Sequence, residues 1–190
     1  MFVEINGHNI YYEIHGDGIP VMTIHGFSVD HRLMKGFIEK FIPKEKYKRV
    51  YFDLPGMGRT EKGKQLNKAE EMYEIIKCFI KKTIGSENYI IIGQSYGGYL
   101  MRKLIKDEPD KILGAMFVCP VIYGKSEKRN IPKQEIIYSE INDKDIMETE
   151  VYKNFIDAAT FIKTDIFNNF KENVYPALKI ADEKFLSHYY

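Results

Sequence analysis

The chain has 190 residues, 44% of them hydrophobic and 29% charged, proportions that are typical of a single globular domain. The formal net charge is +1, because 28 Lys and Arg residues balance 27 Asp and Glu residues, and this near-neutrality disfavours a nucleic-acid partner. The two cysteines, Cys78 and Cys119, belong to no Cys-x-x-Cys or Cys/His cluster, so we expect no disulfide framework and no metal site. Each lies in an apolar run, which predicts a small core residue.

The N-terminus lacks the basic and apolar regions of a signal peptide. No apolar run reaches the length of about 18 residues that identifies a membrane-spanning helix. We therefore expect a cytoplasmic protein without a membrane partner.

Strand and helix patterns alternate through the first 120 residues. Strands are expected at residues 2–6, 9–15, 20–24, 48–54, 89–92 and 112–118. Helices are expected to begin near Asp30, Asn67 and Tyr96. The apolar stripe of the first helix is expected to consist of Leu33, Phe37 and Phe41, with Met34 and Ile38 beside it. Because several strands are apolar on both faces, the pattern predicts an α/β fold with a mostly parallel sheet and helices on both faces.

The sequence changes character after Pro120. Residues 131–190 carry helical periodicity, dense charge and frequent aromatic residues. We therefore expect two parts, an α/β core of residues 1–120 and a small helical subdomain of residues 121–190.

The most informative motif is Gly93-Gln94-Ser95-Tyr96-Gly97, which follows an apolar strand pattern and precedes a helical one. A Gly-x-Ser-x-Gly sequence in this position is the pattern of a nucleophile elbow, a sharp turn that presents the serine hydroxyl above the sheet. Glycines are needed beside the serine because the turn brings strand and helix into close contact. Ser95 is therefore the candidate nucleophile for attack on an acyl carbon.

Three motifs, each at the end of an expected strand, together resemble the α/β-hydrolase fold superfamily. They are His25-Gly26-Phe27, Asp53-Leu54-Pro55-Gly56-Met57-Gly58 and Gly93-Gln94-Ser95-Tyr96-Gly97-Gly98. The resemblance covers about residues 1–120, and residues 121–190 resemble the helical cap, or lid, of that family. It implies a serine esterase-like member of the superfamily.

The resemblance also implies a catalytic arrangement around Ser95. Ser95 matches the nucleophile, and the backbone N–H groups of Phe27 and Tyr96 match the two donors of an oxyanion hole. Such donors stabilise the negative oxygen that develops during attack, and removing one typically costs about 2.7–4 kcal/mol. The ring of Phe27 is a candidate wall of the acyl pocket.

Other residues are expected to shape the loops. His25 matches a histidine of the family that supports loop geometry and is not the base. The resemblance assigns turn support to three glycines, Gly26, Gly93 and Gly97. Asp53 is expected to organise its own loop through hydrogen bonds to the backbone. A dinucleotide-binding loop at Gly56-Met57-Gly58 is disfavoured, because Glu61 stands where a third glycine is required.

The acid and the base of the expected triad are harder to place. Hydrolases of this fold carry the acid and then the histidine after the nucleophile, and His188 is the only histidine that follows Ser95. One alternative is an internal triad of Ser95, Asp143 or Asp145, and His188. The other is that two last strands, with the acid and the base, are missing from this chain and belong to a C-terminal segment or a second chain. The strand at 112–118 would then be an uncovered edge.

These patterns favour a serine hydrolase that acts on a small carboxylic ester or thioester through an acyl-enzyme on Ser95. No cofactor is expected. This chain alone should be weakly active, because a serine hydroxyl without a base is a poor nucleophile. Aminopeptidase action at an N-terminal proline, carbon–carbon bond hydrolysis and acyl transfer remain open, since a fold does not choose among them. The alternative class is a non-catalytic hydrolase-like protein that binds a small ligand, or an inactive fragment.

Overall fold

The structure is a computed structural model that describes residues 1–124 and 126–188. Six strands form one sheet in the order β1-β2-β4-β3-β5-β6. They are β1 (Phe2–Ile5), β2 (His8–His15), β3 (Ile19–Ile24), β4 (Tyr47–Phe52), β5 (Tyr89–Gln94) and β6 (Ile112–Val118). β3 is parallel to β4 and β5, and β5 is parallel to β6, whereas β2 is antiparallel to both of its neighbours. The expected mostly parallel sheet is confirmed.

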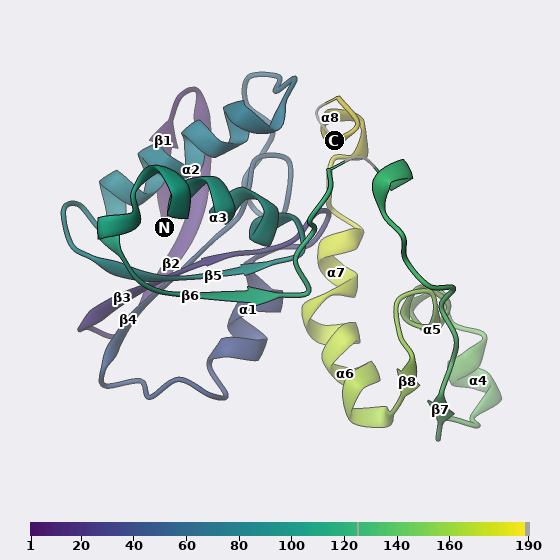
Figure 1. The fold of residues 1–190 in the computed structure, drawn as a ribbon. Coiled ribbons are helices and arrows are strands. Elements are labelled where there is room, and N and C mark those ends of the chain that lie inside the picture. The colour runs from purple at the N-terminus through teal and green to yellow at the C-terminus, as the bar shows by residue number, and fades with distance from the viewer. Residues whose placement is uncertain (125, 189–190) are drawn as a thin grey trace.

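Helices cover both faces of this sheet (Figure 1). α2 (Ala69–Thr83) and α3 (Tyr96–Asp107) lie over one face, and α1 (His31–Ile38) lies under the other. A 3-10 turn (Pro109–Lys111) links α3 to β6. Successive strand residues point to opposite faces, so Ile91 of β5 joins the main core under α2 and α3 while Ile92 joins the cluster that faces α1.

Residues 121–124 and 126–188 form a largely helical segment that extends away from the sheet (Figure 1). Its described elements are η2 (Ser126–Lys128), β7 (Tyr138–Ser139), α4 (Lys144–Met147), α5 (Glu150–Ile156), β8 (Phe161–Ile162), α6 (Thr164–Asn173), α7 (Tyr175–Leu178) and α8 (Glu183–Leu186). β7 and β8 form a short parallel pair that the sequence pattern did not predict. The segment has an apolar cluster of its own, which includes Phe155 and Phe167.

The end of this helical segment returns to the α/β core. Phe185 and Leu186 are buried in the main apolar cluster, and the N–H of Asp182 donates to the carbonyl of Gly56 at 2.9 Å. The helical segment is therefore fastened to the loop that follows β4. The expected boundary at residue 120 separates the two parts along the sequence. In space, however, α8 packs against the α/β core.

Two expectations about side-chain burial are wrong. α1 ends at Ile38 and buries Met34 and Ile38, while Phe41 lies beyond the helix and is 72% exposed. Cys119 is exposed rather than in the core, because β6 ends at Val118 and lies at the open edge of the sheet. Among the described residues, no helix combines the length and the apolar character needed to cross a membrane.

Candidate active site

Ser95 occupies a strained turn between β5 and α3. Its backbone angles are φ 50° and ψ −113°, a sparsely populated region that costs on the order of 1–3 kcal/mol for a residue with a side chain. The N–H of Ser95 donates to the carbonyl of Val118 at 3.0 Å, and the carbonyl of Ser95 accepts from the N–H of Val121 at 3.0 Å. Backbone bonds to the chain around the end of β6 therefore hold the turn in place.

The glycines of the motif permit close contact between strand and helix. A methyl group at Gly97 would collide with the carbonyl of Ile24 at the end of β3, and one at Gly93 would lie 2.5 Å from the Met101 sulfur. These are backbone or deeply buried neighbours, and Met101 is fully buried. The strand–turn–helix geometry expected of a nucleophile elbow therefore rests on both positions.

The loop after β3 lies directly beside this elbow. A methyl group at Gly26 would collide with the Gln94 side-chain oxygen and would lie 3.1 Å from the Ser95 Cβ. The Phe27 and Tyr96 rings meet edge to face, with centroids 5.6 Å apart and planes at 86°. The two residues expected to carry the oxyanion donors therefore contact each other, one directly after Ser95 in the chain and the other directly after Gly26, which lies beside Ser95. Their donor role stays a prediction.

His25 has a structural environment. It is fully buried, its Nδ1 lies 2.7 Å from the carbonyl of Gly26, and its Nε2 accepts from the N–H of Leu54 at 2.9 Å. This pattern is that of a neutral imidazole with a proton on Nδ1. Burial lowers the pKa of His25 further, although the nearby Asp53 opposes that shift. Both ring nitrogens join the loops after β3 and β4, which agrees with a supporting role and not with that of a base.

A buried ionic network supports the same loops, and the sequence patterns did not reveal it. One carboxylate oxygen of Asp53 accepts from the backbone N–H of His31 at 2.8 Å and lies 2.7 Å from its Nδ1. The other oxygen accepts from the N–H of Arg59 at 2.8 Å. On the far side of the imidazole, Nε2 of His31 lies 3.4 Å from a Glu13 carboxylate oxygen. Asp53 thus organises its loop as expected, with His31 as an additional partner.

The electrostatics of Asp53 follow from these contacts. Burial alone would raise the pKa of Asp53, but the hydrogen bond from His31 and the neighbouring imidazoles hold the pKa below its ordinary value. Asp30, His31 and Asp53 bring potential ligand atoms within 4.8 Å of one another. However, Asp30 pairs with Arg32, and Asp53 accepts hydrogen bonds from the backbone N–H groups of His31 and Arg59, so donors of the protein already engage both carboxylates.

The structure does not bring the acid and base of an internal triad together. Asp143 caps α4 by accepting from the N–H groups of Asp145 and Ile146. His188 follows α8, and its Nδ1 lies 2.7 Å from the carbonyl of Lys184. α4 and α8 lie at opposite ends of the helical segment (Figure 1), so neither Asp143 nor Asp145 reaches His188.

A base for Ser95 is also absent from the other described histidines. Within residues 1–124 and 126–188, the Ser95 hydroxyl forms no hydrogen bond. His15 pairs with Glu13, His8 is buried in β2, and His25 and His31 are held in the contacts described above. In the described part of the chain, Ser95 therefore has no hydrogen-bonded imidazole.

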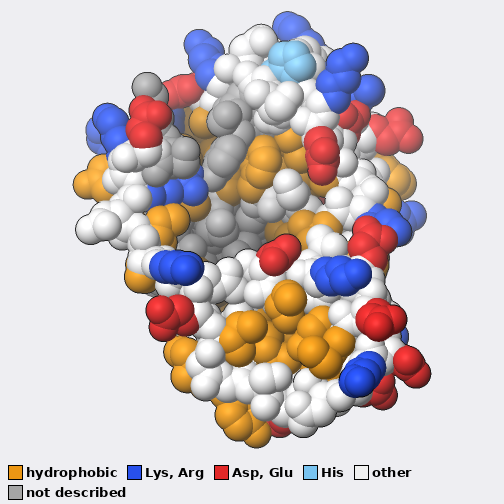
Figure 2. Space-filling view, turned by 90° about the vertical axis from the view of Figure 1, so that its right-hand side faces the viewer, with side chains coloured by type: hydrophobic (Ala, Val, Ile, Leu, Met, Phe, Trp, Pro, Cys, Tyr) orange, Lys and Arg blue, Asp and Glu red, His pale blue; other side chains and the backbone are white. Residues whose placement is uncertain are grey.

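Two cavities adjoin the elements of the site. The first, of about 710 Å³, lies between Ser28, one residue after Phe27, and the helical segment, where Glu150, Asn154 and Tyr175 line it. The face that carries the helical segment is hollowed, and hydrophobic side chains line part of the hollow (Figure 2). A cavity of this size accommodates a small organic substrate.

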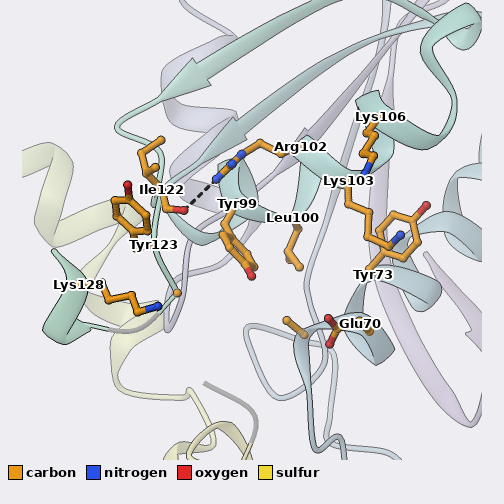
Figure 3. Close-up of a pocket in the computed structure, with 12 residues that line it drawn as sticks. Glu70, Tyr73, Tyr99, Leu100, Arg102, Lys103, Lys106, Ile122, Tyr123 and Lys128 are labelled. Atoms are coloured by element: carbon orange, nitrogen blue, oxygen red, sulfur yellow. Dashed lines mark hydrogen bonds between the residues drawn. The ribbon is translucent and has the colours of Figure 1, made fainter.

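The second cavity, of about 700 Å³, lies between α2, α3 and the chain after β6. Arg102 points across it toward Ile122 and donates to its carbonyl at 2.9 Å, while Tyr73 and Lys103 lie together at the other end (Figure 3). Tyr99, one helical turn after Ser95, also lines this cavity. Four of its lining residues are basic, namely Arg102, Lys103, Lys106 and Lys128.

A serine on a strand-to-helix elbow, next to the loop of a neighbouring parallel strand, defines the class of α/β-hydrolase folds. A family model described as the alpha/beta hydrolase fold matches residues 19–165. The chain belongs to this family.

Several relatives share parts of the sequence. The chain is 29% identical over 125 residues to the dihydrolipoyllysine-residue acetyltransferase component of the acetoin cleaving system of Cupriavidus necator, a match that covers 65% of this chain and 32% of that protein. It is 25% identical over 104 residues to the pimeloyl-[acyl-carrier protein] methyl ester esterase of Legionella pneumophila, with 55% and 39% coverage. The chain therefore spans less than half of either curated relative.

Solved structures share the fold. The alpha/beta superfamily hydrolase of Oenococcus oeni PSU-1 superposes with a TM-score of 0.90 at 28% identity, covering 100% of this chain and 70% of that one. A thermophilic esterase of Thermogutta terrifontis superposes with a TM-score of 0.58 at 20% identity, covering 66% and 48%. This second likeness concerns the fold alone.

Proposed function

We propose that this chain carries the nucleophile of a serine hydrolase that acts on a small carboxylic ester or thioester. The observation that carries the proposal is the backbone of Ser95, held at φ 50° and ψ −113° at the start of α3. Proteins retain such strain where a functional side chain needs a fixed direction. In the proposed reaction, the Ser95 oxygen attacks the acyl carbon, the alcohol or thiol leaves, and water then releases the acid from the acyl-enzyme.

The surroundings of Ser95 support this chemistry. The backbone N–H groups of Tyr96 and Phe27 are proposed to hold the oxyanion, because Tyr96 follows the serine directly, Phe27 follows Gly26 beside the Ser95 Cβ, and the two rings contact each other. The helical segment is proposed to act as a cap, since the cavity beside Ser28 lies beneath it. The esterase of Legionella pneumophila, as its name states, acts on a methyl ester, which agrees with an ester substrate.

A second candidate function is a non-catalytic hydrolase-like protein that binds a small ligand. It is favoured by the absence of a histidine bonded to Ser95 among the described residues. A general base contributes roughly 10²–10⁴-fold to such reactions, so a chain without one reacts slowly even with the nucleophile in position.

The experiment is fluorophosphonate labelling of the wild-type chain, of Ser95→Ala and of Ser139→Ala, read by intact mass. Ser139 lies in the exposed pair β7–β8 and serves as the matched control. The proposal expects slow labelling of one site that disappears only in Ser95→Ala. Turnover of p-nitrophenyl acetate should likewise be slow in the wild-type chain and in Ser139→Ala, and should be lost in Ser95→Ala.

Two results would decide against the proposal. Ester turnover that survives Ser95→Ala would show that another group carries the activity. A complete lack of labelling in folded protein at long exposure, together with saturable ligand binding, would favour the non-catalytic function.

A further inference from the structure

The cavity of about 700 Å³ between α2, α3 and the chain after β6 has no part in the proposed reaction (Figure 3). It shares no lining residue with the cavity beside Ser28, where the ester substrate is proposed to bind. Its volume lies within the range of roughly 300–1,000 Å³ that is usual for small-molecule sites. The cavity is therefore large enough for a separate organic ligand.

Apolar and aromatic side chains form its floor and part of its walls. Leu100 and Tyr73 are 3% and 2% exposed and belong to the main core, so this floor is rigid. Tyr99 of α3 and Tyr123 after β6 line the cavity from two different elements (Figure 3). Tyr123 is 56% exposed and is open to contact. Aromatic faces of this kind stack on the flat ring of a ligand.

One face of α3 adds positive charge that the protein does not neutralise. Arg102 and Lys106 lie four residues apart, a spacing at which like charges are neighbours and repel each other. Arg102 donates to the neutral carbonyl of Ile122, and Lys106 makes no hydrogen bond or ion pair within the described part of the chain. By contrast, Lys103 on the same face pairs with Asp107 at 2.8 Å. Two cations beside the cavity thus lack a carboxylate partner.

A third cation comes from a different element. Lys128 of η2 lines the cavity and has no ion pair with any described residue. Among the described lining residues, Glu70 at the start of α2 is the acidic one. A phosphate monoester carries a charge of about −1.5 to −2 at pH 7, and a guanidinium group matches its oxygens with two parallel hydrogen bonds. Phosphate is therefore the anion that several cations, one of them an arginine, fit best.

We propose that this cavity binds a small molecule of the nucleoside monophosphate class, in which a flat ring is joined to a phosphate. The phosphate lies against Arg102 and Lys106, with Lys128 approaching from η2. The ring lies over the apolar floor and stacks on Tyr99 and Tyr123. Because Ser95 does not line this cavity, the site is independent of the proposed hydrolase reaction.

The test is isothermal titration calorimetry of the chain with adenosine 5′-monophosphate, compared with adenosine and with inorganic phosphate. Adenosine lacks the anion and inorganic phosphate lacks the ring, so each offers only part of the contacts. The monophosphate should bind about tenfold or more tightly than either, since one charged hydrogen bond or one stacked base has about that effect. Added salt should weaken its binding, because the lining cations are exposed to solvent.

Variants separate the contact with the phosphate from the contact with the ring. Lys106→Gln should weaken binding of the monophosphate by about tenfold, and it removes no contact with another described residue. Lys81→Gln is the matched control, because Lys81 is exposed in the last turn of α2 and does not line the cavity. Tyr123→Ala should also weaken the monophosphate by about tenfold while leaving inorganic phosphate unchanged, a difference that general unfolding would not produce.

The outcomes distinguish this site from the proposed reaction. Ser95→Ala should bind the monophosphate as the wild type does, so a failure of the hydrolase proposal leaves this result intact. Folded protein without saturable binding of the monophosphate would overturn the proposal. Equal affinity for the monophosphate and inorganic phosphate would indicate an anion site only and would overturn the nucleoside class. Binding that is the same in wild type, Lys106→Gln and Tyr123→Ala would place the ligand outside this cavity.

Discussion

The strain at Ser95 leads to a prediction about the stability of the fold that is independent of activity. Replacement of Ser95 by glycine should stabilise the fold relative to replacement by alanine, although both changes remove the proposed nucleophile. The backbone of Ser95 lies at positive φ, a conformation that glycine adopts without steric cost and alanine does not. Ser95 is the N-cap of α3 but makes no side-chain capping bond, so neither replacement removes a helix cap.

The magnitude follows from two opposing terms. Relief of the strained backbone contributes about 1–3 kcal/mol in favour of glycine. The greater flexibility of glycine in the unfolded chain opposes this by about 0.5–1 kcal/mol. The expected net difference is about 1 kcal/mol in the free energy of unfolding. For a domain of this size, that difference corresponds to about 2–4 °C in the melting temperature.

Urea denaturation and thermal melts of Ser95→Gly and Ser95→Ala measure this difference directly. The same pair of replacements at Ser139 is the control, because its backbone lies in β7 and is not among the positive-φ positions. There, alanine should be the more stable variant. If alanine is equal to or more stable than glycine at Ser95, the turn is not strained and the case for a nucleophile elbow fails.

Three further predictions concern the loops and the helical segment. Gly97→Ala should cost about 3 kcal/mol, the upper range for overpacking, and should abolish probe labelling, because the methyl group meets the carbonyl of Ile24. Phe185→Ala should cost about 3–5 kcal/mol and speed proteolysis of the helical segment, since Phe185 is 2% exposed in the main core, whereas Phe41→Ala at a 72% exposed site should change little. Folding lowers the pKa of His25, because burial disfavours the charged imidazole. The fold is therefore most stable above the unfolded pKa of about 6.5, where His25 is neutral in both states. As the pH falls below that value, the free energy of unfolding should decrease by at most about 1.4 kcal/mol per pH unit. His25→Gln should flatten that dependence in urea denaturation between pH 7 and pH 5.

Each of these predictions has a contrary result. Wild-type stability in Gly97→Ala would mean that α3 does not approach β3 as closely as described. Equal rates of proteolysis for the Phe185→Ala and Phe41→Ala variants would show that Phe185 does not fasten the helical segment to the core. A pH dependence unchanged by His25→Gln would place the titrating group elsewhere.

The elbow could be predicted from sequence because its determinants are local. Two glycines, a serine and the flanking apolar runs lie within one short stretch, and the turn that they specify is the one observed at Ser95. The alternation of strands and helices is equally local, and it gave the mostly parallel sheet. The cap at Asp30 is a third case, since its side chain accepts from the N–H of Arg32 as its position predicts.

What the sequence did not reveal depends on contacts between distant segments. His31 follows a helix cap and gives no sign that it bonds Asp53, 22 residues further along. The stripe of α1 was misassigned because the helix ends at Ile38, before Phe41. The burial of Phe185 in the main core depends on the return of the chain to Gly56. A helical period alone cannot show which distant surface a side chain meets.

The distinction between local and distant contacts also applies to the chemical groups of the site. Ser95, its strain and its neighbouring amides are specified within β5, α3 and the loop after β3, and the apolar residues of β5 and α3 are packed in the core. A base for Ser95 would have to be held beside the hydroxyl by contacts between distant segments, and none of the described histidines bonds to it. The exposure of Met116 and Phe117 on β6 likewise depends on which element neighbours that strand, although both residues read as core residues in the sequence. A local pattern therefore specifies the elbow and the strand, but not what stands beside either of them.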